Sequence, residues 1–116
     1  MRAEAQNNVE AIEKSLALLR QRIGWETAEH RLEELNAMTE DPELWNDPDR
    51  AQTLMRERQT LVAAMDGYKA MAQEKSDSVE LIELGEMEGD EEVVKDAENA
   101  LKALRERAAQ AELEAL

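Results

Sequence analysis

A chain of 116 residues has room for one domain, or for a few long helices with their connections, but not for an enzyme domain with a large regulatory partner. Its formal net charge of −14 repels a phosphate backbone, and no run of Lys and Arg offsets that charge locally, so we expect no direct nucleic-acid binding. Cysteine is absent, which excludes disulfides and thiolate chemistry. The chain has neither an apolar stretch of about 20 residues nor the apolar core of a signal peptide, which predicts a cytoplasmic protein without membrane contact.

The composition favours helices over strands. Ala, Glu, Leu, Met, Gln and Arg are strong helix formers and dominate the chain, whereas Val, Ile and Thr are few. Charged residues make up 36% and Phe is absent, so the modest apolar surface suits the thin packing of long amphipathic helices. Disorder is the competing interpretation of so polar a chain, and the periodicity of its apolar residues argues against it.

The first apolar stripe predicts a helix that ends near Gly24. Its members alternate in steps of three and four, which places them on one helical face: Val9, Ile12, Leu16, Leu19 and Ile23. A second stripe begins directly after the glycine: Trp25, Ala28, Leu32 and Leu35. Because an isolated glycine weakens a helix, we expect a kink or short break at Gly24 rather than one unbroken rod.

Segment 41–50 holds both prolines of the chain and must interrupt the helices. Each Asp-Pro pair has the chemistry of a helix start, because Asp accepts hydrogen bonds from first-turn amides and Pro lacks the hydrogen that would be unpaired there. We expect Asp41 to cap one turn and Asp47 to cap a long helix. Between these caps we predict that Leu44 and Trp45 are both buried in a groove between helices, because a free loop would expose a large indole to water.

The same three-four spacing after Pro48 predicts the longest helix of the chain, about seven turns long. The one polar interruption of its apolar stripe is Arg58, whose side chain either extends to solvent or pairs with an acidic neighbour across the bundle. Gly67 weakens this helix by roughly 1 kcal/mol relative to alanine without ending it. The predicted stripe comprises seven positions: Ala51, Leu54, Arg58, Leu61, Met65, Tyr68 and Ala72.

Two further helices are predicted in the last third of the chain. Ser76-Asp77-Ser78 indicates the start of a short helix, which Gly85 to Gly89 closes and whose apolar face holds Val79, Ile82 and Met87. Asp90-Glu91-Glu92 then places acids at the positive end of a last helix. Its stripe is again heptad-like: Val94, Ala97, Leu101, Leu104, Ala108, Ala111 and Ala115. The chain ends at Leu116 without a Gly or Pro stop signal, which predicts a longer parent protein.

Together these elements predict an all-α fold. We expect an antiparallel helical bundle with coiled-coil-like packing, made of three long helices plus one or two short ones. The connections at 41–49 and 85–90 are too short to let successive helices run parallel. The simplest organisation is a single helical domain over residues 1–116.

No set of residues fits a catalytic, cofactor or metal site, so we predict no site residues of these kinds. The only histidine, His30, cannot form a histidine-rich metal site and fits a solvated or partly packed position. Four separated glycines provide no phosphate-binding loop. Carboxylate pairs such as Glu33-Glu34 and Glu91-Glu92 fit solvated helix faces better than a glycosidase-type pair, because no cleft is evident. The net charge likewise favours core packing over base stacking for the three aromatic residues: Trp25, Trp45 and Tyr68.

One stretch carries a family resemblance. Leu32-Glu33-Glu34-Leu35-Asn36, followed by Asp41-Pro42-Glu43-Leu44-Trp45-Asn46-Asp47-Pro48-Asp49-Arg50-Ala51-Gln52, closely resembles the corresponding part of bacterial peptide chain release factor 2. An Asp-Pro cap, a Leu-Trp pair, a second Asp-Pro cap and an Arg-Ala-Gln helix start, in that order, are hard to produce by helix chemistry alone. The resemblance continues more loosely through 57–71 and 79–104, and so covers nearly the whole chain. Release factor 1 has a similar helical domain, but Leu-Trp-Asn-Asp-Pro is closer to factor 2.

The resemblance implies that residues 1–116 are the N-terminal domain of a longer release factor, joined there to a core that reads the stop codon and triggers ester hydrolysis. Neither decisive family motif is in this chain, because Ser-Pro-Phe needs Phe and Gly-Gly-Gln needs adjacent glycines. The implied role is non-catalytic docking and positioning, with the ribosome as partner through a ribosomal protein near the factor-binding stalk base, and help with the closed-to-open rearrangement of the whole factor. The alternative is a free-standing coiled-coil adaptor or chaperone-like protein, which would usually dimerise through its stripes.

Overall fold

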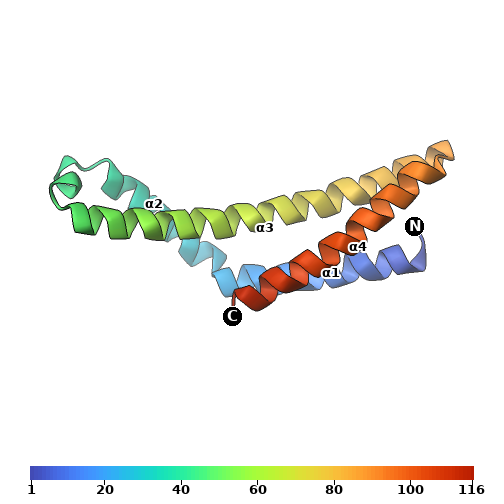
Figure 1. The fold of residues 1–116 in the computed structure, drawn as a ribbon, viewed down its shortest axis with the longest axis horizontal. Helices are drawn as coiled ribbons and strands as arrows, with labels where there is room; N and C mark the ends of the chain where they lie inside the picture. The colour runs from blue at the N-terminus through green and yellow to red at the C-terminus, as the bar shows by residue number, and fades with distance from the viewer. The chain divides into compact units, whose positions relative to one another are not determined.

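The computed structural model describes residues 1–116 and contains helices but no strand (Figure 1). The prediction of an all-α fold is therefore confirmed. In chain order the elements are four α-helices and one short 3-10 helix, η1, placed between the second and third: α1 Ala3–Ile23, α2 Trp25–Thr39, η1 Pro42–Asn46, α3 Pro48–Glu88 and α4 Glu91–Glu114.

Two of the interruptions lie where glycine adopts a left-handed backbone. Gly24 has φ 67° and ψ 58°, and it separates α1 from α2 as its position in the sequence predicts. Gly89 has φ 67° and follows the last residue of α3. There the amide of Asp90 donates to the carbonyl of Gly85 at 2.8 Å, and the amide of Gly89 donates to Glu86 at 3.3 Å. This is the hydrogen-bond pattern of a Schellman motif, which satisfies carbonyls that a helix end would leave unpaired.

Aspartates begin three of the helical elements. The Oδ1 atom of Asp41 accepts from the amide of Glu43 at 3.0 Å at the start of η1. Asp47 caps α3 by accepting from the amide of Arg50 at 3.2 Å, so both predicted Asp-Pro caps are confirmed. Asp90 caps α4 in the same way, through the amide three residues later at 3.2 Å.

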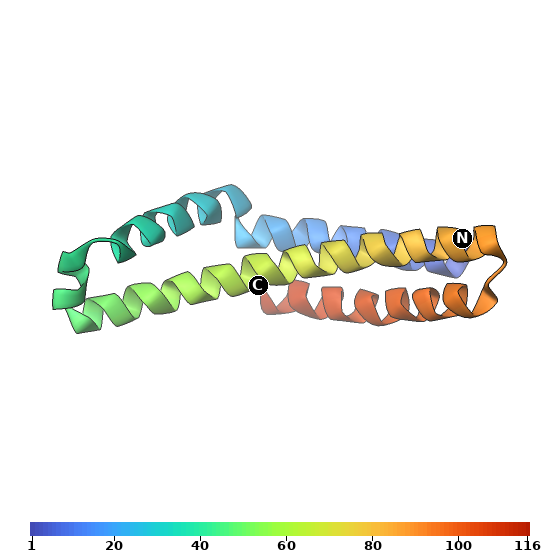
Figure 2. The ribbon, with the colours of Figure 1, turned by 90° about the horizontal axis from the view of Figure 1, so that it is seen from above.

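The chain forms two compact units, one made of Met1–Arg22 and Tyr68–Leu116 and the other of Ile23–Gly67. Within the first unit, α3 and α4 run antiparallel across their short turn, and α1 runs parallel to α4 (Figure 2). The ion pairs Arg2–Glu98 and Arg22–Glu112 show the parallel direction, because both partners advance along the chain together. This unit is a three-helix bundle built from α1, the later part of α3, and α4.

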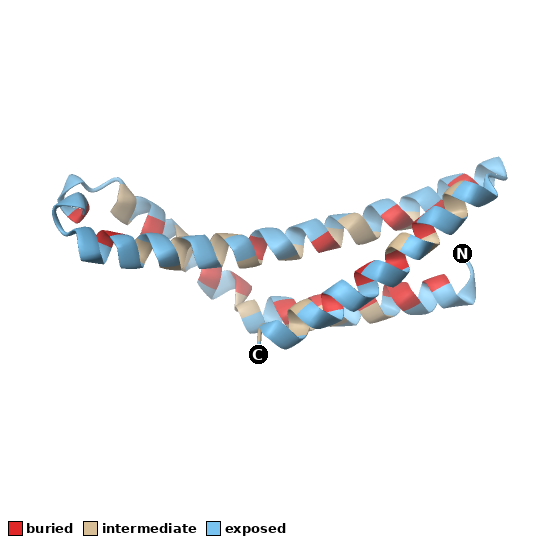
Figure 3. Ribbon diagram, in the orientation of Figure 1, coloured by how far each residue is buried: buried red, intermediate tan, exposed pale blue.

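The core of this bundle is narrow and aliphatic. Ile12, Ile82, Leu101 and Leu104 are fully buried, at 0% exposure each (Figure 3 shows buried residues in red). Seven further buried residues complete it, and the alanines among them allow close helix approach: Ala5, Val9, Leu16, Leu19, Met71, Ala97 and Ala108. The predicted stripes of the first and last helices are thus confirmed at their central positions.

The second unit packs α2 and η1 with the first part of α3. Its buried apolar side chains are Trp25, Ala28, Leu35, Leu44, Ala51 and Met65. The indole nitrogen of Trp25 donates to Glu29 at 2.6 Å, so this ring is buried with its polar atom satisfied. Arg58 is half-buried and donates to the side-chain oxygen of Asn36 at 2.7 Å at an exposed site, so its partner is an amide rather than an acidic neighbour.

The predicted helix start at Ser76-Asp77-Ser78 is wrong, because α3 continues unbroken for 41 residues. Asp77 caps nothing: its Oδ1 accepts from Gln73 at 2.8 Å, an ordinary pair between successive turns. Ser78 is buried at 4% exposure on the same side of the helix as Ile82. Packing of this side into the bundle therefore outweighs the local preference of serine and aspartate for a helix start. Met87, predicted to lie on the buried side, is 84% exposed.

The prediction for the Leu-Trp pair is half right. Leu44 is buried at 3% exposure, but Trp45 is 52% exposed, and its indole nitrogen donates to the carbonyl of Thr39 at 3.2 Å. The two side chains sit on a 3-10 turn, where successive residues are separated by about 120° because a turn contains about three residues. Only one of two neighbours can then face the helices. Here the leucine does so, and the tryptophan lies over the turn.

Leu44→Ala is expected to destabilise the chain by about 2 to 5 kcal/mol, because it removes a buried side chain and leaves a cavity. Trp45→Ala removes a half-exposed ring and should cost clearly less. Urea unfolding followed by far-ultraviolet circular dichroism measures both. A loss of stability in Trp45→Ala equal to or larger than that in Leu44→Ala would contradict this assignment of the buried position.

Two glycines inside α3 should respond in opposite directions to alanine. A Cβ atom at Gly85 would lie 2.8 Å from Val94 Cγ2 and 3.2 Å from the Asp90 carbonyl oxygen, whereas one at Gly67 meets nothing within 4 Å. Gly67→Ala should therefore stabilise by about 1 kcal/mol through helix propensity alone. Gly85→Ala should destabilise, because valine is stiff and the turn backbone must shift. Thermal unfolding of the two variants measures the signs, and stabilisation by both would show that α4 does not approach Gly85 so closely.

Candidate functional site

The residues that the sequence offers as candidates for catalysis or ligand binding do not form a site. They are exposed and separate, or they pack against other residues. His30 is exposed on α2, and all four carboxylates of Glu33-Glu34 and Glu91-Glu92 are exposed. Nowhere does the structure gather three or more His, Cys, Asp or Glu side chains that could hold a metal ion. Of the three aromatic residues, Trp25 is buried and Tyr68 lies beneath the guanidinium of Arg20, 5.7 Å from the ring centroid. Trp45 is therefore the aromatic side chain that the fold presents most openly.

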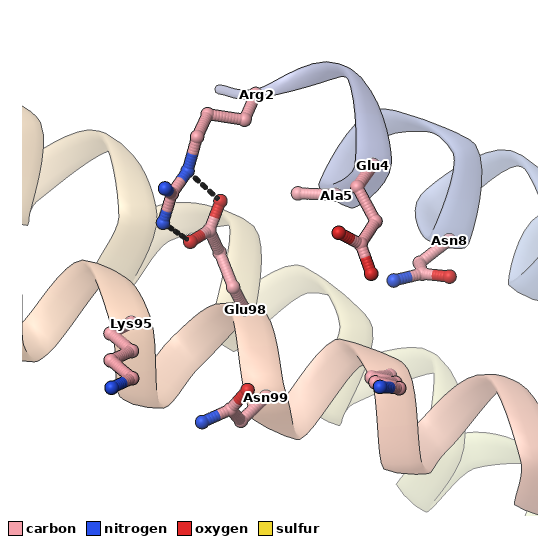
Figure 4. A pocket seen from close by; sticks show the side chains of 8 residues that line it. Arg2, Glu4, Ala5, Asn8, Lys95, Glu98 and Asn99 are labelled. Atoms are coloured by element: carbon pink, nitrogen blue, oxygen red, sulfur yellow. Dashed lines mark hydrogen bonds and ion pairs between the residues drawn. The ribbon is translucent and has the colours of Figure 1, made fainter.

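A polar groove of about 530 Å³ runs between the start of α1 and α4 (Figure 4). The guanidinium of Arg2 reaches across it to Glu98, with its Nε atom 3.0 Å from Oε2 and Nη2 in contact with Oε1. This bidentate hydrogen bond lowers the pKa of Glu98 and raises that of Arg2. The other lining side chains are mixed in charge: Glu4, Ala5, Asn8, Lys95, Asn99 and Lys102. The groove is thus bridged by its own ion pair.

Other polar side chains between the helices of this bundle also find partners within it. Arg105 donates to Asn8 at 3.1 Å, and Arg107 donates to both carboxylate oxygens of Glu74 at 3.0 and 2.9 Å. No buried side-chain nitrogen or oxygen lacks a hydrogen-bond partner. These contacts fix how the helices pair and leave no unpaired buried polar group to receive a ligand.

In the second unit one ion pair joins two helices. Arg31 Nη2 lies 2.8 Å from Glu57 Oε1, which joins α2 to α3. The hydrogen bond from Arg31 lowers the pKa of Glu57, and the same contact raises the pKa of Arg31. Both side chains are about one-third exposed, so solvent screens the pair and it serves to align the helices more than to stabilise them.

One part of the exposed surface is both apolar and acidic. Several large apolar side chains are exposed: Met1, Trp45, Met55, Leu81, Leu84, Met87, Leu113 and Leu116. Three of these, Leu81, Leu84 and Met87, lie near the end of α3. The chain has no basic residue between Lys75 and Lys95, on either side of this helix end. Leu81 and Leu84 lie outside the apolar face that was predicted from the sequence, because that face was placed on Val79 and Ile82. The signal that marks them is the spacing of three between Leu81, Leu84 and Met87.

None of the helices is both long enough and apolar enough to cross a membrane. Among protein families, the PCRF domain model matches residues 28–116. The chain is 70% identical over all 116 residues to peptide chain release factor 2 of Ruegeria sp. strain TM1040. It is 64% identical to the protein of the same name from Roseobacter denitrificans and 52% identical to that from Paramagnetospirillum magneticum, again over its whole length.

Each of these alignments covers the whole of this chain and 31% of the relative, so the chain spans about a third of the length of the curated relatives it matches. The resemblance that was read from the Asp-Pro, Leu-Trp and second Asp-Pro segment is thereby confirmed. The chain belongs to the PCRF domain family, and over its full length it is similar to part of bacterial peptide chain release factor 2.

Proposed function

We propose that this chain is the non-catalytic N-terminal helical domain of a translation termination factor, and that it docks and positions that factor on the ribosome. The observation that carries the proposal is the 70% identity over the whole chain to a protein named peptide chain release factor 2. The parent factor acts in the cytoplasm, where termination takes place.

The arrangement of side chains supports docking rather than chemistry. Polar groups between the helices are engaged with one another, as in Arg2–Glu98 and Arg107–Glu74, and so serve the register of the bundle. Exposed apolar and acidic side chains lie together at the end of α3. A net charge of −14 disfavours ribosomal RNA as the direct contact and favours a basic protein. The partner proposed from the family resemblance is a ribosomal protein near the factor-binding stalk base.

In this proposal the steps of codon reading and peptidyl-tRNA hydrolysis belong to the remainder of the parent factor. This domain contributes binding energy and orientation, which place the catalytic groups in the rest of the factor correctly on the ribosome. Its removal should weaken the encounter with the ribosome and leave the chemical groups intact.

Deleting residues 1–116 from the whole factor should raise the concentration needed for half-maximal peptide release by roughly tenfold or more, about 1.4 kcal/mol of binding energy. The single-turnover release rate at saturating factor should stay within a few-fold of the undeleted factor. The measurement is release of labelled peptide from ribosomes paused at a stop codon, over a range of factor concentrations.

Leu113→Ala in the otherwise intact factor is a suitable control, because it truncates one exposed side chain and keeps the domain. Complete loss of the chemical step in the deleted factor at saturation would refute a positioning role. An unchanged concentration dependence would refute the docking role.

A further inference from the structure

The end of α3 carries an apolar row that the fold does not use. Leu81, Leu84 and Met87 are 46%, 49% and 84% exposed. Residues three apart on a helix are neighbours, with Cβ atoms about 5 to 6 Å apart, so the three side chains form a contiguous ridge. The other side of the same turns is buried through Ser78, Ile82 and Gly85 and belongs to the bundle core (Figure 3). The helix is therefore apolar on two sides, and only one of them is covered.

Acidic residues surround this row, and their own segment of the chain contains no basic residue. Eight acids and no basic residue lie between Lys75 and Lys95, and all eight are exposed: Asp77, Glu80, Glu83, Glu86, Glu88, Asp90, Glu91 and Glu92. One of them, Glu86, pairs with the N-terminal ammonium group at 3.0 Å. Glu80, Glu83 and Glu88 form no ion pair in the chain, although they stand on the same turns as the row. Their charge is thus available to a partner.

The apolar row and the acids around it together favour one kind of binding partner. A second copy of the chain would bring eight like charges to the same place, and RNA or an anionic membrane surface would meet the same repulsion. An apolar ridge gains nothing from a purely basic, hydrated surface, so the partner must also offer an apolar recess. A basic protein surface with an apolar recess rimmed by Lys or Arg satisfies both requirements.

We infer that the ridge of Leu81, Leu84 and Met87, with Glu80, Glu83 and Glu88 beside it, is the surface by which this domain docks onto a basic protein of the ribosome. The inference rests on the proposed function, because it names the part of the domain that makes the contact. The acids steer the encounter and the apolar row holds the complex, so the two groups should govern association and dissociation respectively. Three side chains make a small contact, which suits a factor that must leave after one round of release.

The experiment uses the whole factor with Leu84→Ala and Met87→Ala together, and Leu113→Ala as the matched control. Leu113 is 58% exposed, close to the 49% of Leu84, and lies on α4 in the same bundle. Alanine keeps the helix propensity, and an unchanged melting temperature verifies that the fold is intact. Binding to ribosomes paused at a stop codon should weaken by about tenfold in the double variant, through faster dissociation, and stay unchanged in the control.

A second variant separates charge from apolar contact. Glu80→Gln and Glu83→Gln together should slow association about two- to fivefold at low salt, and the difference should vanish at high salt because exposed charges are then screened. A photo-reactive side chain at position 84 should cross-link to a basic ribosomal protein. A cross-link to ribosomal RNA would overturn the inference.

The factor that lacks residues 1–116 is measured beside these variants. If that deletion weakens binding while the double alanine variant does not, the ridge is not the docking surface and the proposed function still stands. If neither change affects binding, both proposals fail. Sedimentation of the 116-residue chain tests the second-copy alternative, and a dimer that the double alanine variant converts to a monomer would overturn the inference.

Discussion

Burial of one side of α3 along most of its 41 residues is the constraint on which the rest of the structure depends. A helix of that length gains little from propensity alone and is stable because an apolar side is packed. The same helix supplies Ala51 and Met65 to one compact unit and Met71 and Ile82 to the other. Any interruption within residues 76–78 would remove Ser78 and Ile82 from the second of these cores, so the helix continues through residues that favour a start. It ends only at Glu88, where the left-handed Gly89 and the close approach of α4 to Gly85 permit a tight turn.

The polar contacts at the helix edges have a different task. Arg2–Glu98 and Arg22–Glu112 fix the parallel register of α1 and α4, and Arg31–Glu57 fixes the position of α2 against α3. Exposed pairs of this kind add little stability, because solvent screens them. They instead select one alignment among the several that thin aliphatic stripes with many alanines would accept. The perturbed pKa values of Glu98 and Glu57 are accordingly marks of helix pairing rather than of acid-base chemistry.

The helix ends at Gly24, Asp41, Asp47 and Asp90 could be predicted from the sequence, because these residues act through local hydrogen bonds and backbone geometry that their neighbours determine. The central core positions could be predicted from the three-four spacing of the apolar residues. Prediction from the sequence was wrong where the burial or conformation of a residue depends on tertiary packing. The Leu44-Trp45 pair reads as two buried residues until the turn between the caps is known to be a 3-10 helix, which separates neighbouring side chains by about 120°. Ser76-Asp77-Ser78 reads as a cap until the bundle that buries Ser78 is known. The exposed ridge was not predicted for a related reason. The buried face of this segment includes Ile82, so Leu81 and Leu84 lie outside the apolar stripe that the sequence predicts.

The exposed ridge and the negative net charge together determine which surfaces this domain can bind. Three apolar side chains at the end of α3 contribute little to folding, because the bundle core already lies on the other side of the helix. On a neutral surface they would favour self-association; the surrounding acids oppose it by like-charge repulsion. The same acids repel RNA within a Debye length of about 8 Å at physiological salt. In the proposed function the domain binds the ribosome, a particle rich in RNA. The acids are repelled by most of the ribosomal surface and attracted only where a basic protein is exposed. Specificity then comes as much from the contacts that the charge forbids as from the one contact that the ridge makes.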